Sequence, residues 1–543
     1  MQKHQFRNSI AENVFRHKYA MYPHETWENA AERLVEDVLG TRWGTTTPLI
    51  DKDGYRRLKN YIIDMKFMPG GRYVYYAGRE LKAYNNCFLL KALEDTREEW
   101  ARLCYKSMLF LTYGGGIGID YSVIRPRGKI LKRTGGISSG IVPLMEAINE
   151  IGRKVQQGGS RRSAIYGSVR ATHEDAEEVL YAKDWSRDIF NGITIADIKK
   201  HNFDFPAPLD MTNISLNYNY KDWLDLPIFR DNIVQALKTG EPGFSFNFDN
   251  PNETGRNACC EVVSEEDSDV CNLGSVNVGN IDNVEELKDV VYLGAWFLAA
   301  GTIRGVVPDE EVKAVRDKNR KVGLGLMGIH EFLMKNNSKY EVTSDLKKYL
   351  EVYKEYSEKG ANDFCDRFYL NRPEKYRAIA PTGSIGTIAG TTTGIEPLYA
   401  IAYKRRYLKN NKWNYEYAVD TTAHELIQKY DVDPNSIETA SSLTEDIEKR
   451  IKFQYEVQKY VDMAISSTIN LPKWGSKNNN EKLVDSYADM IKKYAPGLRG
   501  LTFYPDGSRG GQPLESVDYN TAIKNKGVVF EENEPCKGGI CGV

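Results

Sequence analysis

Short runs of strand-forming residues alternate with amphipathic helical stretches along most of this chain, which leaves few fold classes open. Between residue 68 and about residue 500 the runs include SAIYGSV (163–169), TNISLNYN (212–219) and GFSFNF (243–248). Such alternation is typical of α/β proteins, in which helices cover a largely parallel sheet. We therefore expect one large α/β domain over residues 68–512.

The two ends of the chain have a different character. Residues 1–67 are expected to form a small helical region, because apolar residues such as Trp27 and Leu34 recur on one helical face before a Pro-Gly-Gly break. Residues 513–543 are expected to form a flexible tail, because they end in EENEPCKGGICGV, which has too little apolar surface to pack.

Charge and hydropathy exclude several classes of partner. With 73 basic and 75 acidic residues the formal net charge is −2, so no overall basic field attracts a nucleic-acid polymer. No apolar stretch approaches the length of a bilayer span, and the N-terminus lacks the apolar core of a secretory signal. We expect a cytoplasmic protein with no membrane partner. Eight cysteines are too few for a disulfide scaffold, so their positions matter more than their number.

The segment NACCE places three reactive groups at alternate positions. In an extended loop Asn257, Cys259 and Glu261 would point to the same side. A thiol can lose a hydrogen atom and persist as a radical, a carboxylate can move a proton, and an amide can hold a hydroxyl. The alternative is a turn with an incidental thiol.

Four further cysteines form two candidate dithiol pairs. Cys87 and Cys271 each begin or end a strand-like run, while Cys536 and Cys541 lie five residues apart in the tail. Thiol–disulfide exchange between the pairs needs an arm that can reach the body of the protein, which a flexible tail supplies. A zinc site in the tail is the alternative, but zinc needs four ligands and no second pair lies nearby, so we expect no metal site.

A glycine-rich segment supplies a candidate anion site. Residues 380–387 read APTGSIGT and lead into TTTGIEP at 391–397. Backbone amides and hydroxyls in such a loop can hold phosphates, especially where a helix begins. On its own this signal is weak, since a loop of Ser, Thr and Gly is more often only a loop.

Taken together and in chain order, these segments resemble those of ribonucleotide reductases from about residue 67 to the end. The matching segments are MPGGR (68–72), NNCFLL (85–90), GGGIGIDYSVIRPRG (114–128), QQGGSRRSA (156–164), NACCE (257–261), CNLGSVN (271–277), NRKVGLGLMG (319–328), PTGSIG with GTTTGIEP (381–397), LTFYPDGSRGGQ (501–512) and the CxxxxC tail. The resemblance implies a ten-stranded α/β barrel with a central finger loop that carries the radical cysteine at its tip.

The resemblance also assigns roles to the residues at the finger tip. Cys259 resembles the thiyl radical that takes the 3′-hydrogen of a ribonucleotide, Glu261 the general base on the 3′-hydroxyl, and Asn257 a hydrogen-bond partner of the substrate. One position departs from the family pattern: residue 260 is also a cysteine. We assign the radical to Cys259 because it keeps the N-x-C-x-E spacing.

The remaining roles concern electrons and substrate binding. Cys87 and Cys271 resemble the pair that donates two electrons and closes into a disulfide. Cys536 and Cys541 resemble the shuttle that reopens it with electrons from a thioredoxin-like reductant. The residues expected to bind substrate are Asn86, Pro381, Thr382, Gly383, Ser384 and Ile385.

The source of the radical is suggested by Phe503-Tyr504-Pro505-Asp506. Reductases that receive a radical from a metal subunit have two adjacent tyrosines here, and proline cannot relay a radical. YPDGSR is instead similar to the YRDGSR of class II enzymes, which implies adenosylcobalamin as cofactor. Two alternatives stay open: a class I-type subunit that relays through Tyr504 from a separate metal protein, and a nucleotide-binding redox sensor without turnover.

Control by nucleotides is indicated less clearly. Residues 1–65 do not show the ATP-cone pattern of many relatives, whereas Asp95 resembles a residue of the site for a nucleoside triphosphate effector. The alternative for Asp95 is a solvated acid at a helix start. The sequence leaves open whether the substrate is a diphosphate or a triphosphate, and whether the chain is a monomer or a homodimer.

Overall fold

The computed structural model describes residues 6–40, 48–132, 135–155, 163–202, 204–409, 412–508 and 514–531. Within these ranges no helix is both long and apolar enough to cross a membrane.

The N-terminal region is helical, as predicted. It contains α1 (Ser9–Lys18), α2 (Trp27–Leu39) and α3 (Lys52–Ile63), and each helix is capped by a side chain that accepts a backbone N–H of its first turn. Trp27 and Leu34 are buried, in line with their predicted common face. The three helices share one hydrophobic cluster with helices and strands of the α/β domain, and the division at residue 67 stays a prediction.

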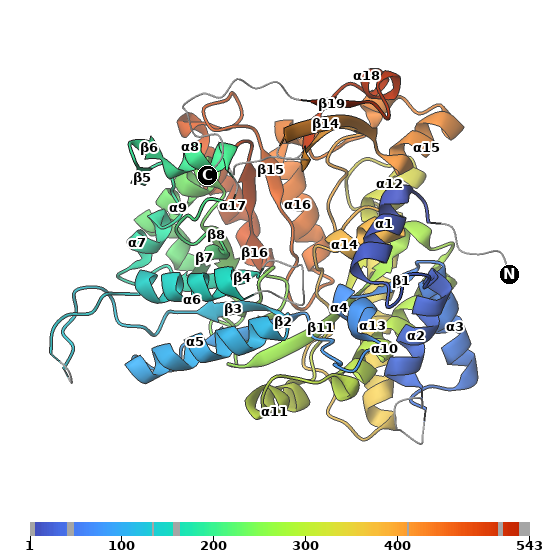
Figure 1. Ribbon diagram of the computed structural model, residues 1–543, viewed down its shortest axis with the longest axis horizontal. Coiled ribbons are helices and arrows are strands. Elements are labelled where there is room, and N and C mark those ends of the chain that lie inside the picture. Colours follow the sequence, from blue (N-terminus) through green and yellow to red (C-terminus); the bar gives the residue numbers. More distant parts are fainter. Residues whose placement is uncertain are drawn as a thin grey trace.

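The α/β domain is a barrel made of two halves (Figure 1). The strands within each half are parallel, and the two halves run antiparallel to each other. In the first half five strands run parallel in the order β2 (Cys87–Lys91), β3 (Gly116–Asp120), β4 (Ile165–Arg170), β7 (Thr212–Tyr218) and β8 (Gly243–Phe246). In the second half β11 (Asp269–Asn277) is parallel to β12 (Val322–Met327), and parallel bridges continue through residues 377–379 to β15 (Ile469–Leu471) and β17 (Phe503–Pro505).

The two halves meet at two antiparallel joints. At one joint β11 pairs with β2, and at the other β16 (Gly500–Leu501), which leads into β17, pairs with β8. Counted over the described residues, these pairings give the ten extended segments and the closed α/β barrel that were predicted. A short strand, β1 (Phe67–Pro69), pairs with β11 on its other side.

The finger loop is a hairpin of β9 (Gly255–Arg256) and β10 (Val263–Ser264). It lies against β3 at positions where that strand has glycine. A Cβ atom at Gly118 would lie 1.8 Å from the carbonyl oxygen of Arg256, and one at Gly116 would lie 2.7 Å from Cβ of Ala258. The glycines of GGGIGID therefore make room for the finger.

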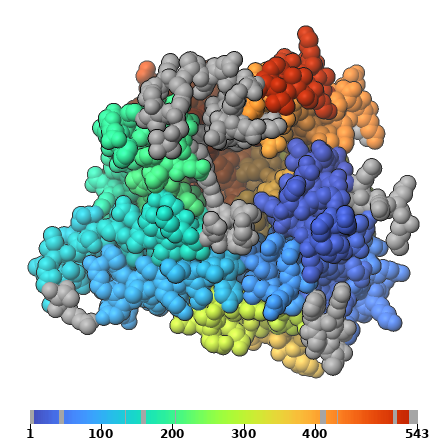
Figure 2. All heavy atoms as spheres, in the orientation of Figure 1, coloured from blue at the N-terminus to red at the C-terminus, as the bar shows by residue number. Residues whose placement is uncertain are grey.

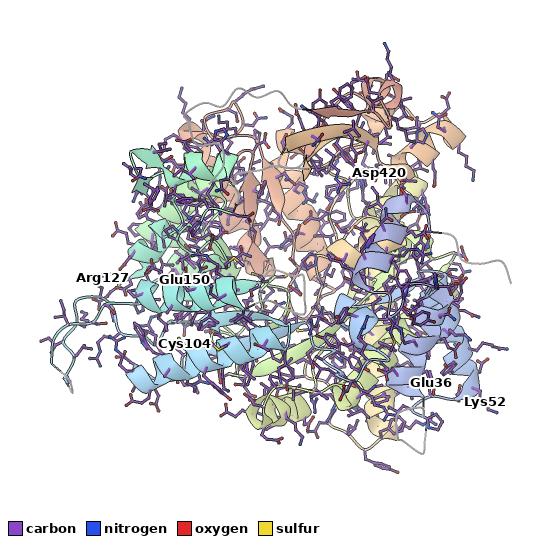
Figure 3. The ribbon with its side chains drawn as sticks, in the orientation of Figure 1. Glu36, Lys52, Cys104, Arg127, Glu150 and Asp420 are labelled. Atoms are coloured by element: carbon purple, nitrogen blue, oxygen red, sulfur yellow. The ribbon has the colours of Figure 1, made fainter. Side chains whose placement is uncertain are left out.

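Helices cover the outside of the barrel (Figure 1). Cys104, labelled in Figure 3, lies on α5. Over the described residues the helices beyond α3 are α4 (Gly71–Tyr76), α5 (Arg97–Thr112), α6 (Val142–Lys154), α7 (Ala176–Tyr181), α8 (Ile195–His201), α9 (Pro227–Thr239), α10 (Val284–Arg304), α11 (Glu310–Asn319), α12 (Ile329–Lys335), α13 (Ser344–Arg367), α14 (Gly383–Ala389), α15 (Thr421–Tyr430), α16 (Ile447–Gln458), α17 (Val484–Tyr494) and α18 (Tyr519–Lys524).

The C-terminal segment differs from the prediction. A separate four-stranded sheet runs in the order β18 (Leu514–Ser516), β13 (Ala402–Lys409), β14 (Lys412–Val419) and β19 (Val529–Glu531). The prediction of a flexible tail is therefore wrong for residues 514–531. Their apolar residues pack where the hairpin of β13 and β14 offers a partner: Phe530 stacks on Tyr415 with ring centroids 5.0 Å apart. A small hairpin of β5 (Ile189–Phe190) and β6 (Ile193–Thr194) completes the strands of the described part.

Candidate active site

A cavity of about 370 Å³ lies where the finger tip, the start of β2 and the glycine-rich loop meet. Its volume is within the range of small-molecule sites. Cys87, Cys259 and Glu261 line it together with residues 381–385, so the structure brings these predicted residues together. The other lining residues are Lys18, Tyr19, Gly70, Gly71, Arg72, Tyr75, Tyr76, Asn86, Leu273, Gly274, Ser275 and Ala380.

A tight turn at the finger tip presents Cys259. The backbone N–H of Cys260 donates to the carbonyl oxygen of Asn257 at 3.0 Å, and Cys260 has a left-handed φ of 69°. This conformation reverses the chain directly after Cys259, which is half-buried and lines the cavity. Burial raises the pKa of the Cys260 thiol, and the neighbouring Cys259 and Glu261 add to the shift. Cys260 is not among the residues that line the cavity.

Asn257 joins the finger to Cys87. Its side chain Nδ2 lies 2.9 Å from Sγ of Cys87, and its Oδ1 accepts the backbone N–H of Val262 at 2.9 Å. The asparagine is fully buried and does not line the cavity. In this structure it positions Cys87 and the turn, and its predicted contact with substrate stays a prediction.

Cys87 and Cys271 are direct partners across the antiparallel joint of the barrel. They face each other in the register of β2 and β11, and neither cysteine forms a disulfide. Directly opposed residues on antiparallel strands have Cα atoms about 4.5–5.5 Å apart, a spacing that allows a disulfide. Gly323 on β12 leaves room behind this pair, since a Cβ there would lie 3.1 Å from Sγ of Cys271.

The protonation of Cys271 follows from its surroundings. Burial raises the pKa of the Cys271 thiol well above its ordinary value, and the nearby carboxylate of Asp269 raises it further. At neutral pH this sulfur therefore keeps its proton. A protonated thiol can give both a proton and an electron, which a thiolate cannot.

Two polar side chains face the part of the cavity near the sulfurs. Glu261 is 1% exposed and lines the cavity beside Cys259. Asn86 also lines it, and its Oδ1 is a buried acceptor without a hydrogen-bond partner among the described atoms. Such an acceptor fits a hydroxyl or amine donor of a bound molecule.

The glycine-rich loop also lines the cavity. Thr382 has a left-handed φ of 50° and precedes α14, and its Oγ1 accepts the backbone N–H of Gly394 at 2.8 Å. A Cβ at Gly383 would meet nothing within 4 Å, so this turn is open. Backbone N–H groups in the first turn of a helix have no partners within that helix and remain available to a ligand.

Other predicted residues lie apart from the cavity or beyond the described chain. Asp95 lies beyond the far end of β2, whose last residue, Lys91, is roughly 13 Å from Cys87 along the strand. Its carboxylate accepts both the backbone N–H of Arg125, at 2.9 Å, and Nε of the same residue, at 2.7 Å. Its role as an effector residue stays a prediction. Cys536 and Cys541 lie outside the described residues.

Several lining residues were not predicted. Arg72 belongs to the MPGGR segment and Ser275 to CNLGSVN, so motifs that carried the resemblance could have indicated them. Lys18 and Tyr19 come from the end of α1, in a region without any recognisable motif. Within the described chain, no group of three or more His, Cys, Asp or Glu residues could hold a metal ion.

Comparisons with known proteins bear on this arrangement. The family model described as ribonucleotide reductase, barrel domain, matches residues 85–201, 225–354 and 372–504. The chain is 25% identical to the vitamin B12-dependent ribonucleoside-diphosphate reductase of Thermoplasma acidophilum, over 88% of this chain and 68% of that protein. It is 26% identical to the protein of that name from Mycobacterium tuberculosis (strain CDC 1551 / Oshkosh), over 94% and 79%.

A solved structure shares the fold. It is described as a B-12 dependent (class II) ribonucleotide reductase and superposes with a TM-score of 0.70, at 15% sequence identity. The match covers 97% of this chain and 95% of the other. This likeness supports the barrel fold derived above from the strand pairing.

Proposed function

The chain belongs to the ribonucleotide reductase family, and we propose that it converts ribonucleotides to 2′-deoxyribonucleotides through a thiyl radical on Cys259. One observation carries the proposal. Cys87, Cys259 and Glu261 line a single cavity together with the loop 381–385, and Cys271 lies directly opposite Cys87.

The orientation that we propose for the nucleotide is based on the residues that line this cavity. Residues 382–385 would hold the phosphates through backbone amides and hydroxyls, which places the ribose near the three sulfurs. The buried acceptor of Asn86 would receive a ribose hydroxyl. Pro381 would hold the start of this turn.

The chemistry balances with the groups present. The Cys259 radical takes the 3′-hydrogen, and Glu261 takes the 3′-hydroxyl proton while the 2′-hydroxyl leaves as water. Cys87 and Cys271 together supply two protons and two electrons and become a disulfide. Return of a hydrogen atom from Cys259 to C3′ regenerates the radical, so the net change is ribonucleotide plus dithiol to deoxyribonucleotide, disulfide and water.

The residues near the chain end fit a cobalamin-dependent reductase. In β17 Tyr504 is followed by Pro505, which has no phenol, so a two-tyrosine relay cannot be built here. Cobalamin is also what the names of the relatives in Thermoplasma and Mycobacterium specify. When bound, adenosylcobalamin supplies the oxidising equivalent that turns the Cys259 thiol into a radical. We expect Cys259 and Tyr504 to face it.

Two further assignments extend the proposal. Cys536 and Cys541 would reduce the disulfide of Cys87 and Cys271 by exchange and pass the electrons on from a thioredoxin-like reductant. Asp95 would take part in binding a nucleoside triphosphate effector. A cytoplasmic location would supply both the reductant and the nucleotides.

The test is direct assay of deoxynucleotide. The wild-type chain is incubated with adenosylcobalamin, a dithiol and each ribonucleotide as diphosphate and as triphosphate. We expect deoxynucleotide that depends on cobalamin and is absent with Cys259→Ser. No product from any of these substrates would contradict the proposal, and product without cobalamin after a metal protein is added would favour the class I-type alternative.

A further inference from the structure

The N-terminal helix α1 runs along α14, the helix that follows the phosphate loop. Figure 1 shows the two helices side by side, and the two are in contact. In the space-filling view the N-terminal residues, in dark blue, lie at the surface beside a central recess (Figure 2). This segment lies outside every motif discussed above, yet it reaches the substrate cavity.

Both ends of α1 contact α14 or its flanks. Near the start, Nη1 of Arg7 donates to the carbonyl oxygen of Gly390 at 2.8 Å, directly after α14 ends. At the other end, Nζ of Lys18 lies 3.3 Å from Oγ of Ser384, in the first turn of α14. Residues 7–18, which contain α1, thus span α14 from Gly390, directly after its end, to its first turn, which lines the cavity.

Packing holds α1 in this place. Phe15 is fully buried and packs edge-to-face on Trp27 of α2, with ring centroids 5.4 Å apart. Tyr19 is 9% exposed, and its hydroxyl would lie 2.7 Å from a Cβ at Gly71. Lys18, between these anchors, is exposed but lines the cavity. Its position near the phosphate loop is therefore set by neighbours that are themselves buried.

Lys18 brings a positive charge to the loop that would hold the phosphates. Of the described residues that line the cavity, only Lys18 and Arg72 are cations. Arg72 is 8% exposed, donates to the carbonyl oxygen of Tyr113 and stacks on Tyr76 at 4.5 Å. Lys18 has a flexible stem and a compact ammonium that can move from Ser384 to a phosphate.

We propose that Lys18 binds the terminal phosphate of the nucleotide, so that α1 forms part of the substrate site. This inference rests on the proposed function for the identity of the ligand. A triphosphate carries more charge than a diphosphate and extends further from the ribose, toward the exposed side chain of Lys18. The lysine therefore strengthens binding of a triphosphate more than that of a diphosphate.

The test measures occupancy of the cavity without requiring turnover. Cys259 is alkylated with N-ethylmaleimide, and protection by each ribonucleotide is read from the modified peptide by mass spectrometry. Cys104, on α5 and outside the cavity, serves as internal reference. The variants are Lys18→Gln, Lys18→Arg and, as matched control, Arg16→Gln, because Arg16 lies on the same helix and pairs with Glu12 at 2.7 Å.

We expect Lys18→Gln to raise the protecting concentration about tenfold for triphosphates, which corresponds to about 1.4 kcal/mol, and about threefold for diphosphates. Lys18→Arg should stay close to wild type, Arg16→Gln should show no change, and added salt should shrink the difference. Equal protection of Lys18→Gln and wild type would overturn the inference. An equal loss for both substrate classes would also overturn it, since that points to a structural role.

The experiments can contradict the reductase proposal and the assignment of Lys18 independently of each other. If the wild-type chain makes no deoxynucleotide but its protection by triphosphates depends on Lys18, the catalytic proposal falls and the assignment of Lys18 stands. If deoxynucleotide forms and protection is independent of Lys18, the reverse holds.

Discussion

Replacing Gly118 with alanine should displace the finger loop and abolish most of the activity while the barrel stays folded. The added Cβ would lie 1.8 Å from the carbonyl oxygen of Arg256 and 3.2 Å from Cα of Asn257. A carbon and a carbonyl oxygen approach no closer than about 3.3 Å, so the finger must withdraw by about 1.5 Å. Both atoms belong to the backbone, so no side-chain rotation can relieve the overlap.

The size of the effect follows from this displacement. A misplacement of about 1 Å at a reacting group can cost about 100-fold in rate, or about 2.7 kcal/mol in the barrier. Overpacking of this kind typically lowers stability by about 1–3 kcal/mol, which a large barrel can tolerate. We therefore expect Gly118→Ala to lower kcat/KM by at least about 100-fold and Tm by only a few degrees.

The assay compares activity and thermal unfolding with two other variants. Gly500→Ala is the matched control, because the nearest atom to its Cβ would be the carbonyl oxygen of Phe244 on β8, at 3.2 Å, and no atom of the finger would lie within 4 Å. Gly116→Ala should be impaired as well, since its Cβ would lie 2.7 Å from Cβ of Ala258. Adding Ala258→Gly should restore part of that activity. Near-normal activity of Gly118→Ala, or no rescue by Ala258→Gly, would refute the packing of the finger.

Three other variants test the radical cysteine, the tail cysteines and the protonation of a buried histidine. Cys259→Ala should lose turnover with an unchanged fold, since one half-buried side chain on a turn contributes little stability; residual deoxynucleotide formation would remove Cys259 from its role. Cys536→Ser with Cys541→Ser should limit the enzyme to one turnover when thioredoxin is the only reductant, and sustained turnover would count against the shuttle. Burial lowers the pKa of His330 from 6.5 to about 3, so the neutral ring stabilises the fold above pH 6.5 and this contribution is lost as pH falls. Between pH 7 and pH 5, the free energy of unfolding measured in urea should therefore fall by about 2 kcal/mol more for wild type than for His330→Asn. Equal decreases in the two proteins would contradict this.

Much of the barrel follows from local patterns in the sequence. The runs at 163–169, 212–219 and 243–248 became β4, β7 and β8, because segments rich in β-branched and aromatic residues favour strands. The N-terminal helices were also predictable from their apolar face. Closure of the barrel was expected only from the family resemblance and not from local patterns, since it depends on pairings such as that of β16 with β8, between residues far apart in the chain.

The tail shows why local composition misleads. Residues 514–531 have too few apolar side chains to pack alone, but the hairpin of β13 and β14 gives them two strand edges and an aromatic surface. Phe530 is ordered by a partner more than 100 residues away. Such a partner is invisible to any analysis of the segment itself.

The candidate site divides in a similar way. Cys87, Cys259, Glu261 and the loop 381–385 could be named because their residue types suit the chemistry and their spacing matched a family. Lys18 could not, since a lysine at the end of an amphipathic helix has no distinctive pattern. Only the contact between α1 and α14 places it at the cavity.

The central claim is that a radical on Cys259 starts the reduction of the ribose, and that Cys87 and Cys271 supply the two electrons for this reduction. The measurement uses the pre-reduced chain carrying Cys536→Ser and Cys541→Ser, with adenosylcobalamin, ribonucleotide and no added reductant. Deoxynucleotide is quantified and disulfides are mapped by mass spectrometry. We predict up to one deoxynucleotide per chain, matched by a disulfide between residues 87 and 271, and neither when Cys259 is also replaced by serine. Product without that disulfide, or the same disulfide formed through turnover in the absence of the Cys259 thiol, would contradict the account.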